Sequence, residues 1–357
     1  MVLGTRPETI KLATVIRKLG EDVDVIHTGQ HYDDALFRAH FSSLDLPNPT
    51  LCLSGVGGEA QSYQIENAIP QILNYFERSR PKVAVVQGDT NAASAGAQAA
   101  NFLKIPLIHV EAGLRSYDEY MPEEINRRLI SMLADIHCAP TGGNVRNLIR
   151  EGVPVENIRM TGNTIVEAIA ASMLPDGQSL HLLDDFGLSS GGYVLATVHR
   201  PENTDDSARL DNILKEFAML PLPVVFPVHP RTASCVERFG LQSRLRRLEC
   251  TPPLDHPTFL ALARHSRVLV SDSGGIQEEC TVLKKPLIIL RDNTERPEVI
   301  ESGFAMLVSA RCDFSRQIKP LLYDDAFLHS LASKPCPFGD GKASDRIVEI
   351  IQNIAHD

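Results

Sequence analysis

The chain has 357 residues, of which 43% are hydrophobic and 22% are charged, and its formal net charge is -10. This length exceeds most single hydrophobic cores and predicts two domains, and the composition is that of a globular protein. The negative charge argues against nucleic acid as the main partner, because binding to a phosphate backbone requires a basic surface.

Cysteine spacing and hydropathy exclude further classes of protein. The seven cysteines form no CxxC pair and no zinc-like spacing, so we expect reduced thiols and no metal site. No apolar run approaches the roughly 18 residues of a membrane span, and the first residues lack a signal-peptide pattern. We therefore expect a soluble, cytoplasmic protein with no membrane partner.

Short apolar runs alternate with helical patterns along the first half of the chain, which predicts βαβ units and a parallel sheet. The predicted strands are Met1–Leu3, Val23–His27, Lys82–Gln87, Leu107–Glu111, Ile136–Ala139 and Ile158–Thr161. The predicted helices include Glu8–Leu19, Gln61–Glu77 and Thr90–Leu103.

A second alternation follows the stretch Pro175–Gly192, which its glycine, proline and serine residues predict to be a loop. Its predicted strands are Tyr193–Thr197, Val224–Pro227, Leu248–Thr251, Val268–Val270, Leu287–Leu290 and Ala305–Val308. We predict an α/β protein with two Rossmann-like doubly wound domains, residues 1–168 and 169–342. A helical pattern at Ala343–Ile354, within residues 343–357, is a candidate to cross back onto the first domain.

Three carboxylates are the candidate catalytic groups of the first domain. Asp89 and Glu111 each follow an apolar strand, and Glu123 lies at a proline-initiated helix start. Because ligands of open parallel sheets bind at the carboxyl ends of the strands, we expect the three to converge on one cleft and to transfer protons. The alternative is structural: Asp89 caps the next helix, and Glu123 stabilises its own helix by pairing with Arg127.

Two strand-to-helix turns are candidate anion sites. At Gly4–Glu8, a helix N-terminus and Arg6 favour an anion, with Lys11 one turn further on; the alternative is a plain turn with a surface lysine. At Val270–Glu279, glycines allow a ligand to approach the backbone at a helix N-terminus. There Ser273 is a candidate hydroxyl donor and Glu279 a candidate acceptor of ribose hydroxyls; the alternative is a tight turn whose acids suit the helix dipole.

The second domain carries further polar residues after its strands. His199 is a candidate acid, base or phosphate donor, with Arg200 as a charge clamp, although a histidine after a strand is often structural. His229 ends the next strand in the same way. The charged segment Thr294–Glu298 either closes over a phosphate or is a solvated loop.

Taken together, these motifs resemble the non-hydrolysing UDP-N-acetylglucosamine 2-epimerases. They occur in the family's order over most of the chain: Gly4–Glu8 with Lys11, Gly88–Thr90, Glu111–Arg115, Pro122–Glu124, Gly162–Thr164, His199–Arg200, Asp272–Gly275 with Glu278–Glu279, and Thr294–Glu298. The resemblance implies a glycosyltransferase-B arrangement with the nucleotide sugar between two domains. It also implies a homodimer and epimerisation at carbon 2 of the UDP-sugar, through elimination and re-addition of UDP, without NAD or metal.

The resemblance also assigns residues to roles. The catalytic candidates are Asp89, Glu111, Glu123 and His199. The candidates for binding the UDP-sugar are Arg6, Lys11, Arg115, Arg200, His229, Ser273, Gly274, Gly275, Glu279 and Arg296. Within this set, the backbone at Gly274 and Gly275 is expected to hold the diphosphate, and Arg296 to close on it.

Several alternatives stay open at this point. The segments His199–Asp206, Pro227–Thr232 and Met121–Arg127 also resemble the branch that epimerises UDP-2,3-diacetamido-2,3-dideoxyglucuronate. A hydrolysing epimerase, a retaining glycosyltransferase and a non-catalytic nucleotide-sugar-binding protein are the other readings. Gln30–Asp33 differs from the glutamine-rich segment of allosterically regulated members, which argues against regulation by a second substrate molecule.

Overall fold

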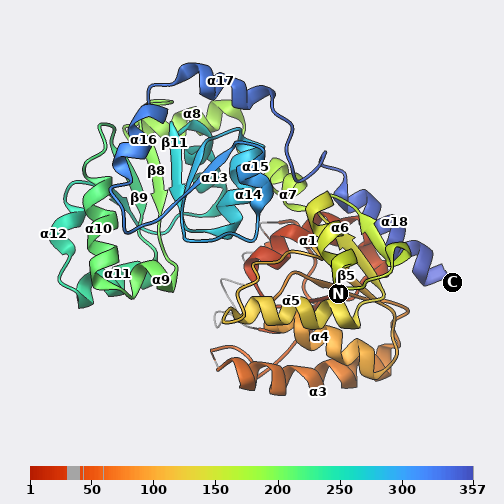
Figure 1. Cartoon of the computed structure of the whole chain (residues 1–357). Helices are drawn as coiled ribbons and strands as arrows, with labels where there is room; N and C mark the ends of the chain where they lie inside the picture. The colour runs from red at the N-terminus through yellow and green to blue at the C-terminus, as the bar shows by residue number, and fades with distance from the viewer. Residues whose placement is uncertain (30–40, 43, 59, 357) are drawn as a thin grey trace. The chain divides into compact units, whose positions relative to one another are not determined.

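The computed structural model describes residues 1–29, 41–42, 44–58 and 60–356, and the chain divides into two compact units (Figure 1). Unit 1 comprises Met1–Ala168 with Phe338–Asp357, and unit 2 comprises Ile169–Pro337. The domain ends expected from the sequence were residues 168 and 342. Each unit has one parallel sheet with helices on both faces, which confirms the predicted α/β class of two Rossmann-like, doubly wound domains.

Unit 1 is built on a seven-stranded sheet of order β3-β2-β1-β4-β5-β6-β7. Its strands are β1 (Val2–Leu3), β2 (Ile26–His27), β3 (Leu51–Cys52), β4 (Ala84–Gln87), β5 (Leu107–Val110), β6 (Ile136–Ala139) and β7 (Ile158–Met160). Its helices within the described ranges are α1 (Arg6–Leu19), α3 (Gln61–Ser79), α4 (Asn91–Phe102), α5 (Pro122–Leu133), α6 (Gly142–Arg150) and α18 (Ala343–His356), with α7 (Ile165–Ser172) at the boundary and 3-10 turns at Gly20–Asp22 and Val155–Asn157.

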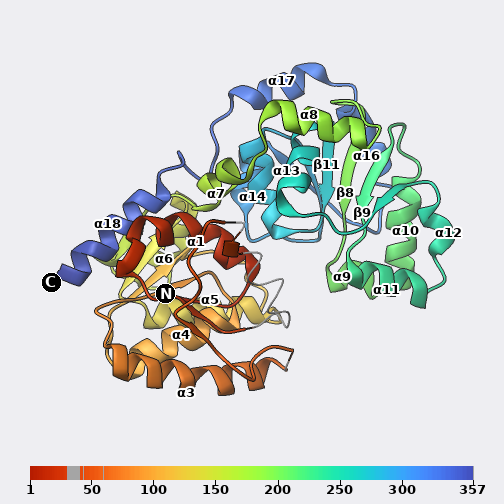
Figure 2. The same cartoon turned by 180° about the vertical axis from the view of Figure 1, so that it is seen from behind.

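Different helices cover the two faces of this sheet. Since successive strand residues point to opposite faces, neighbouring residues of one strand pack against different helices. Leu3 and Val85 lie in the apolar cluster formed with α1 and α18. Their neighbours Val2 and Val86 lie in the cluster formed with α3, α4 and α5. Figure 2 shows α18, from the end of the chain, lying beside α1 on one side of the sheet, with α3 and α4 on the other. The last helix of the chain therefore completes the core of unit 1.

Unit 2 is built on a six-stranded sheet of order β10-β9-β8-β11-β12-β13. Its strands are β8 (Val194–Thr197), β9 (Val224–Pro227), β10 (Glu249–Thr251), β11 (Val268–Ser271), β12 (Leu287–Leu290) and β13 (Ala305–Val308). Its helices are α8 (Asp176–Asp185), α9 (Pro201–Thr204), α10 (Ser207–Phe217), α11 (Pro230–Arg238), α12 (Gln242–Leu245), α13 (His256–His265), α14 (Gly274–Leu283), α15 (Pro297–Glu301), α16 (Ser315–Leu321) and α17 (Asp325–Ser333).

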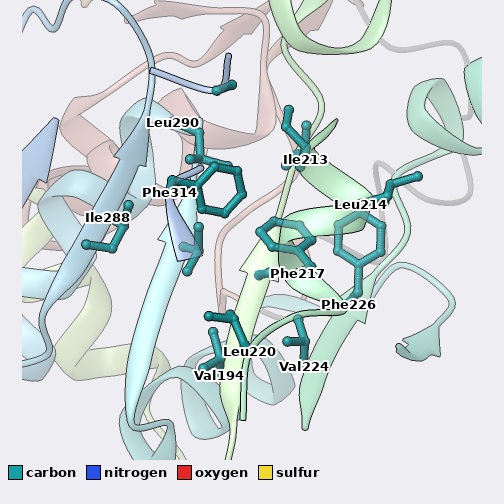
Figure 3. Close-up of a cluster of buried hydrophobic side chains, with 14 of the residues drawn as sticks. Val194, Ile213, Leu214, Phe217, Leu220, Val224, Phe226, Ile288, Leu290 and Phe314 are labelled. Atoms are coloured by element: carbon teal, nitrogen blue, oxygen red, sulfur yellow. The ribbon is translucent and has the colours of Figure 1, made fainter. Parts of the chain in front are cut away.

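Aromatic and aliphatic side chains fill the core on one face of this second sheet (Figure 3). Phe217 of α10 lies at the centre, with its ring centroid 5.8 Å from that of Phe226 in β9 and 5.8 Å from that of Phe314 beside α16. Both pairs are edge-to-face, the arrangement that aromatic quadrupoles favour. This packing holds β8 and β11, whose ends carry the polar residues described below.

Two local predictions differ from the structure. The stretch Pro175–Gly192, predicted to be a loop, contains helix α8, which buries Leu183 and forms a 2.6 Å ion pair from Asp176 to Arg264 of α13. Tertiary packing therefore outweighs the glycine and proline signals. The edge strand β3 had no counterpart in the prediction, because two residues are too short for a periodic pattern. Among the described residues, no helix is both long and apolar enough to cross a bilayer.

Candidate functional site

Two neighbouring strands of unit 1 end in the candidate catalytic carboxylates. Strands β4 and β5 are parallel, and Gln87 is in register with Val110. Glu111 follows Val110 directly and Asp89 follows Gln87 after one glycine, so both acids lie at the same edge of the sheet. This is the edge at which doubly wound folds bind ligands.

Glu111 is a buried carboxylate with a cation beside it. The Lys11 ammonium of α1 donates to both carboxylate oxygens, at 2.8 and 2.7 Å, and the Gln87 amide also donates to this carboxylate. Lys11 is buried, which rules out the interpretation of a surface lysine. Glu111 has a φ of 65°, in the left-handed region that non-glycine residues seldom adopt. Such backbone strain is common at functional sites and persists only where surrounding contacts maintain it.

Asp89 is paired with an arginine of helix α5. The Arg127 guanidinium lies 2.8 Å (Nε) and 2.5 Å (Nη2) from Asp89 Oδ2, and its Nη1 lies 3.0 Å from Glu124 Oε2. Asn126, next to it on α5, donates to the Asp89 carbonyl at 2.9 Å. Thr90, and not Asp89, caps helix α4, because Thr90 Oγ1 accepts from the backbone N–H of Ala93. The structure therefore excludes the capping role for Asp89.

Glu124 is held as an anion on the same helix. Burial by itself raises its pKa, but hydrogen bonds from the Ser116 backbone and from Arg127 outweigh burial, so the pKa lies below its usual range. Glu123, the neighbouring acid, is exposed and has no side-chain hydrogen bond or ion pair with the described residues. Its carboxylate is thus accessible to a ligand.

A buried histidine supports the turn that carries Asp89. His109 of β5 lies 2.8 Å through Nε2 from the Gly88 carbonyl, so this nitrogen must carry the proton. Burial lowers the pKa of His109 to about 3, which keeps the ring neutral. Gly88 has a φ of 69°, a conformation that suits glycine and turns the chain between the strand and Asp89.

The other predicted residues of unit 1 differ in their surroundings. Arg6 is exposed at the N-terminus of α1. Arg115 is buried, and its guanidinium donates to both oxygens of Glu151, at 2.7 and 2.6 Å, and to Ser131 Oγ at 2.9 Å. The bidentate pair occupies much of the donor capacity of Arg115, so the structure gives it an evident structural role.

In unit 2, the candidate histidine lies beside a buried aspartate. His199 Nδ1 lies 3.3 Å from Asp272 Oδ1, and the backbone N–H groups of His199 and Arg200 donate to the same carboxylate. Asn203 of α9 donates to Asp272 as well, at 2.9 Å. Burial lowers the pKa of His199, and Asp272 opposes this change. With Nδ1 directed at the aspartate, Nε2 is the ring nitrogen left for a ligand.

His229 lies next to this pair. Its ring centroid is 5.2 Å from that of His199, at an interplanar angle of 36°. Its Nδ1 accepts from the backbone N–H of Arg231, which fixes the tautomer with the proton on Nε2. Burial lowers the pKa of His229, and Asp272 again opposes the change. The ends of β8, β9 and β11 thus bring together two imidazoles. His229 can donate to an anion through its Nε2–H, and His199 can do so through Nε2 when its ring is protonated.

Helix α14 follows strand β11 with two residues between them, at the predicted phosphate turn. Ser273 is its N-cap, and its side chain makes no capping hydrogen bond. A Cβ on Gly274 would lie 2.9 Å from Arg296 Nη1, whereas a Cβ on Gly275 would meet nothing nearer than 3.9 Å. Gly274 therefore allows the arginine to approach, and Gly275 leaves open space beside the first N–H groups of the helix.

A buried charge network follows that turn. Arg296 donates to Glu278 Oε1 at 2.8 Å and to Glu295 Oε1 at 2.5 Å, and Glu295 also accepts from Arg291 at 2.9 Å. Arg296 is 8% exposed and Glu295 is 3% exposed, so the interpretation of a solvated loop is wrong. Burying such a network costs desolvation that each ion pair must offset.

Glu279, the candidate ribose acceptor, lies further along α14. Its Oε1 is 3.2 Å from His256 Nε2, and its Oε2 is buried without a hydrogen-bond partner among the described residues. Unpaired buried oxygens are costly, and a ligand hydroxyl would satisfy this one. No group of three or more His, Cys, Asp or Glu side chains in the described part of the chain is arranged to hold a metal ion.

The family model of UDP-N-acetylglucosamine 2-epimerase matches residues 15–352. The UDP-N-acetylglucosamine 2-epimerase of Methanocaldococcus jannaschii is 38% identical over 98% of both chains. The chain belongs to the UDP-N-acetylglucosamine 2-epimerase family. This confirms the resemblance read from the motifs and makes the chain a member of an isomerase family.

A solved structure and one further relative are also similar to the chain. A crystal structure of the M. jannaschii UDP-GlcNAc 2-epimerase, in complex with UDP-GlcNAc and UDP, matches with a TM-score of 0.86 at 37% identity and covers 98% of both chains. The UDP-2,3-diacetamido-2,3-dideoxy-D-glucuronate 2-epimerase of Pseudomonas aeruginosa is 33% identical over 99% of both chains. The fold of these relatives resembles that of glycosyltransferase-B proteins, which agrees with the predicted class of two Rossmann-like domains.

The site residues that were not predicted from the sequence all make side-chain contacts with residues far away in the sequence. They are Glu8, Gln87, Thr90, Arg127 and Asp272. Arg127 was considered only as a partner of Glu123 on its own helix, yet it pairs with Asp89, 38 residues away. Asp272 carried a signal, because an acid directly after a buried strand resembles Asp89 and Glu111. The segment Gln30–Asp33 lies outside the described residues.

Proposed function

We propose that the chain is a non-hydrolysing epimerase that interconverts UDP-N-acetylglucosamine and UDP-N-acetylmannosamine. The observation that carries the proposal is the full-length family match, joined to two strand-end carboxylates, Asp89 and Glu111, that are each paired with a cation in unit 1. A cytoplasmic homodimer is part of the same proposal, and sedimentation of the purified protein measures its oligomeric state.

The proposed chemistry begins with removal of the proton on carbon 2 of the sugar. The electron pair of that C–H bond forms the C1=C2 double bond, and the C1–O bond to UDP breaks with its electrons leaving on the phosphate. The products are 2-acetamidoglucal and UDP. In the reverse addition, carbon 2 takes a proton on its other face while UDP returns to carbon 1. Two faces require acid or base groups on each side, and Asp89, Glu111 and Glu123 are the candidates.

Residues of unit 2 are proposed to stabilise the leaving group. The carbon 2 proton is weakly acidic, so a base alone is insufficient and the departing diphosphate must be stabilised. His199, Arg200 and His229 provide donors, the N-terminus of α14 at Ser273–Gly275 provides backbone N–H groups, and Arg296 lies beside that turn. Glu279 is proposed to accept a ribose hydroxyl. In unit 1, Lys11 and Arg6 are the proposed cations on the sugar–phosphate side, whereas the pair with Glu151 gives Arg115 a structural role.

Neutral replacements of the carboxylates test this division of roles. Asp89→Asn and Glu111→Gln are expected to reduce turnover by about 100-fold or more, because an amide does not accept the proton. UDP affinity, measured by calorimetry, is expected to stay within about threefold. Glu167→Gln, an exchange of the same kind on a half-buried acid of α7 that accepts from Ser344, is the control. Full activity in both site variants would contradict the assignment.

A second candidate function is epimerisation of UDP-2,3-diacetamido-2,3-dideoxyglucuronate. Similarity to the Pseudomonas enzyme over nearly the whole chain favours it. Parallel assays with the two UDP-sugars at equal concentrations decide between them, since the competing substrates differ at carbons 3 and 6. A higher kcat/KM for the diacetamido sugar would move the proposal to that branch.

A further inference from the structure

Another buried carboxylate near the edge of the unit 1 sheet is Glu8, which the reaction as proposed above does not use. Glu8 lies in the first turn of α1 and is 2% exposed. Its Oε2 accepts from the backbone N–H of Gly4 at 3.0 Å, from the N–H of Thr5 at 2.8 Å and from Thr5 Oγ1 at 2.8 Å. Its Oε1 accepts from Thr90 Oγ1 at 2.7 Å. One carboxylate therefore joins two turns that are 82 residues apart in the sequence.

Each of these turns leads to a proposed functional group. The first turn starts α1, and one helical turn after Glu8 the Lys11 ammonium reaches the Glu111 carboxylate. The second turn follows β4, where Thr90 is the immediate neighbour of Asp89 and caps α4. A carboxylate that links the turns therefore sets where Lys11 and Asp89 lie relative to each other.

The hydrogen-bond pattern shows that Glu8 links the two turns as a charged carboxylate. Backbone N–H groups only donate, so Gly4 and Thr5 require an acceptor. The Thr90 hydroxyl already accepts from the backbone N–H of Ala93, and its own proton is directed at Glu8. Four donors thus surround the Glu8 carboxylate, which is the arrangement of an anion. Burial nevertheless raises the pKa of Glu8 to about 7, so the anion is lost in mildly acidic solution.

We propose that Glu8 is a positioning residue for the epimerase reaction, whose carboxylate clamps the β1–α1 turn to the β4–α4 turn and so aligns Lys11 with Asp89. This inference rests on the proposed function. Glu8 lies behind the reacting groups and acts through Thr90 and through its own helix. Small displacements of reacting groups reduce rates steeply, and this is the expected route of its effect.

Glu8→Gln and Thr90→Val test the clamp with little change of volume. The first replaces a carboxylate that accepts at both oxygens by an amide that accepts at one, and the second removes the Thr90 hydroxyl. Each is expected to lower kcat by about 10- to 100-fold and to leave KM within about threefold. The double variant is expected to be no slower than the slower single variant, since both remove one interaction. Thr90→Ser keeps the hydroxyl and is expected to retain most of the activity.

The pH profile separates positioning from a general loss of structure. Wild-type kcat is expected to fall as pH drops through about 7, because protonation of Glu8 breaks the pattern of four donors. In Glu8→Gln this acidic limb is expected to disappear or to move below pH 6. The matched control is Glu216→Gln in unit 2, another buried glutamate that accepts from a backbone N–H, that of Ser315 at 2.8 Å. The control is expected to keep the wild-type kcat and pH profile.

The outcomes separate this inference from the proposed function. Suppose that the wild type is an active epimerase. The clamp alone would then be overturned if the kcat losses of the two single variants multiply in the double variant, or if Glu8→Gln keeps the wild-type kcat. A wild type inactive on both UDP-sugars would overturn the proposed function. In that case urea unfolding of the wild type, Glu8→Gln, Thr90→Val and the double variant tests the link between Glu8 and Thr90. Non-additive shifts of the unfolding midpoint support the link, and additive shifts refute it.

Discussion

At the scale of single residues, the acids that end β4 and β5 could be predicted from the sequence, whereas their partners could not. An acid after a buried strand is visible in the sequence, since the strand's apolar run shows where the edge of the sheet lies. The partners of Asp89 and Glu111 come from helices α5 and α1, and no local pattern encodes those contacts. Likewise Asp89 was named as a candidate cap of α4, whereas Thr90 is the cap; both residue types cap helices, so residue type alone does not decide between them.

The titration of His109 alone is expected to make the free energy of unfolding depend on pH. Its folded pKa of about 3 lies below the ordinary value of 6.5, so below pH 6.5 the unfolded chain binds a proton that the folded chain does not. The contribution is therefore complete above pH 6.5 and is lost as pH falls toward 3. We expect about 2 kcal/mol of lost stability between pH 6.5 and 5.

His109→Gln isolates this contribution, because glutamine can still donate to the Gly88 carbonyl but does not titrate. Urea unfolding of unit 1 at several pH values is the measurement. The variant is expected to lose less stability than the wild type between pH 6.5 and 5. Parallel curves for the two proteins would show that His109 titrates normally and would contradict its neutral state.

At the scale of elements, the strands of both sheets other than β3 were predicted within a few residues, because buried β-branched runs bounded by turn residues are distinctive. Helix α8 and strand β3 were missed for opposite reasons. Glycine and proline near α8 suggested a loop, although its packing on α13 stabilises a helix. Strand β3 is held by pairing with β2, and two residues carry too little pattern to show it.

The N-terminus of α14 makes a prediction that belongs to an element. A side chain at Gly275 meets open space in the protein, so Gly275→Val is expected to fold but to block a phosphate from the helix N–H groups. UDP affinity is expected to fall by about tenfold or more, as calorimetry can measure. Gly177→Ala, at an exposed glycine of α8, is the control and is expected to bind UDP normally. Equal affinity in Gly275→Val would refute a phosphate at this turn.

At the scale of the whole molecule, the last helix of the chain, α18, packs in unit 1 and not in unit 2, which precedes it in the sequence. Ile347 and Ile351 of α18 lie in the same apolar cluster as Leu12 and Ile16 of α1. The helical pattern of α18 was clear from the sequence, yet its partner was not, because periodicity shows that a face is apolar and not what covers it. The second sheet, by contrast, is built from one continuous segment of the chain.

Ile347→Ala tests this return. Ile347 is fully buried, and its truncation is expected to destabilise unit 1 by about 2–4 kcal/mol through lost burial and a cavity. Glu349→Ala, two residues away on the exposed face of α18, is expected to change stability by less than about 0.5 kcal/mol. Thermal unfolding of the two variants makes the comparison. Equal melting temperatures would mean that α18 contributes little to the core of unit 1.

The measurement that tests the central claim most directly is proton NMR of the purified protein in deuterium oxide, with UDP-N-acetylglucosamine and no added cofactor. We predict that UDP-N-acetylmannosamine appears with deuterium at carbon 2 and with UDP still attached to the sugar. Free N-acetylmannosamine together with UDP would show hydrolysis and contradict the non-hydrolysing assignment. Epimerisation that retains the original proton at carbon 2 would contradict the proposed exchange of protons through the strand-end carboxylates.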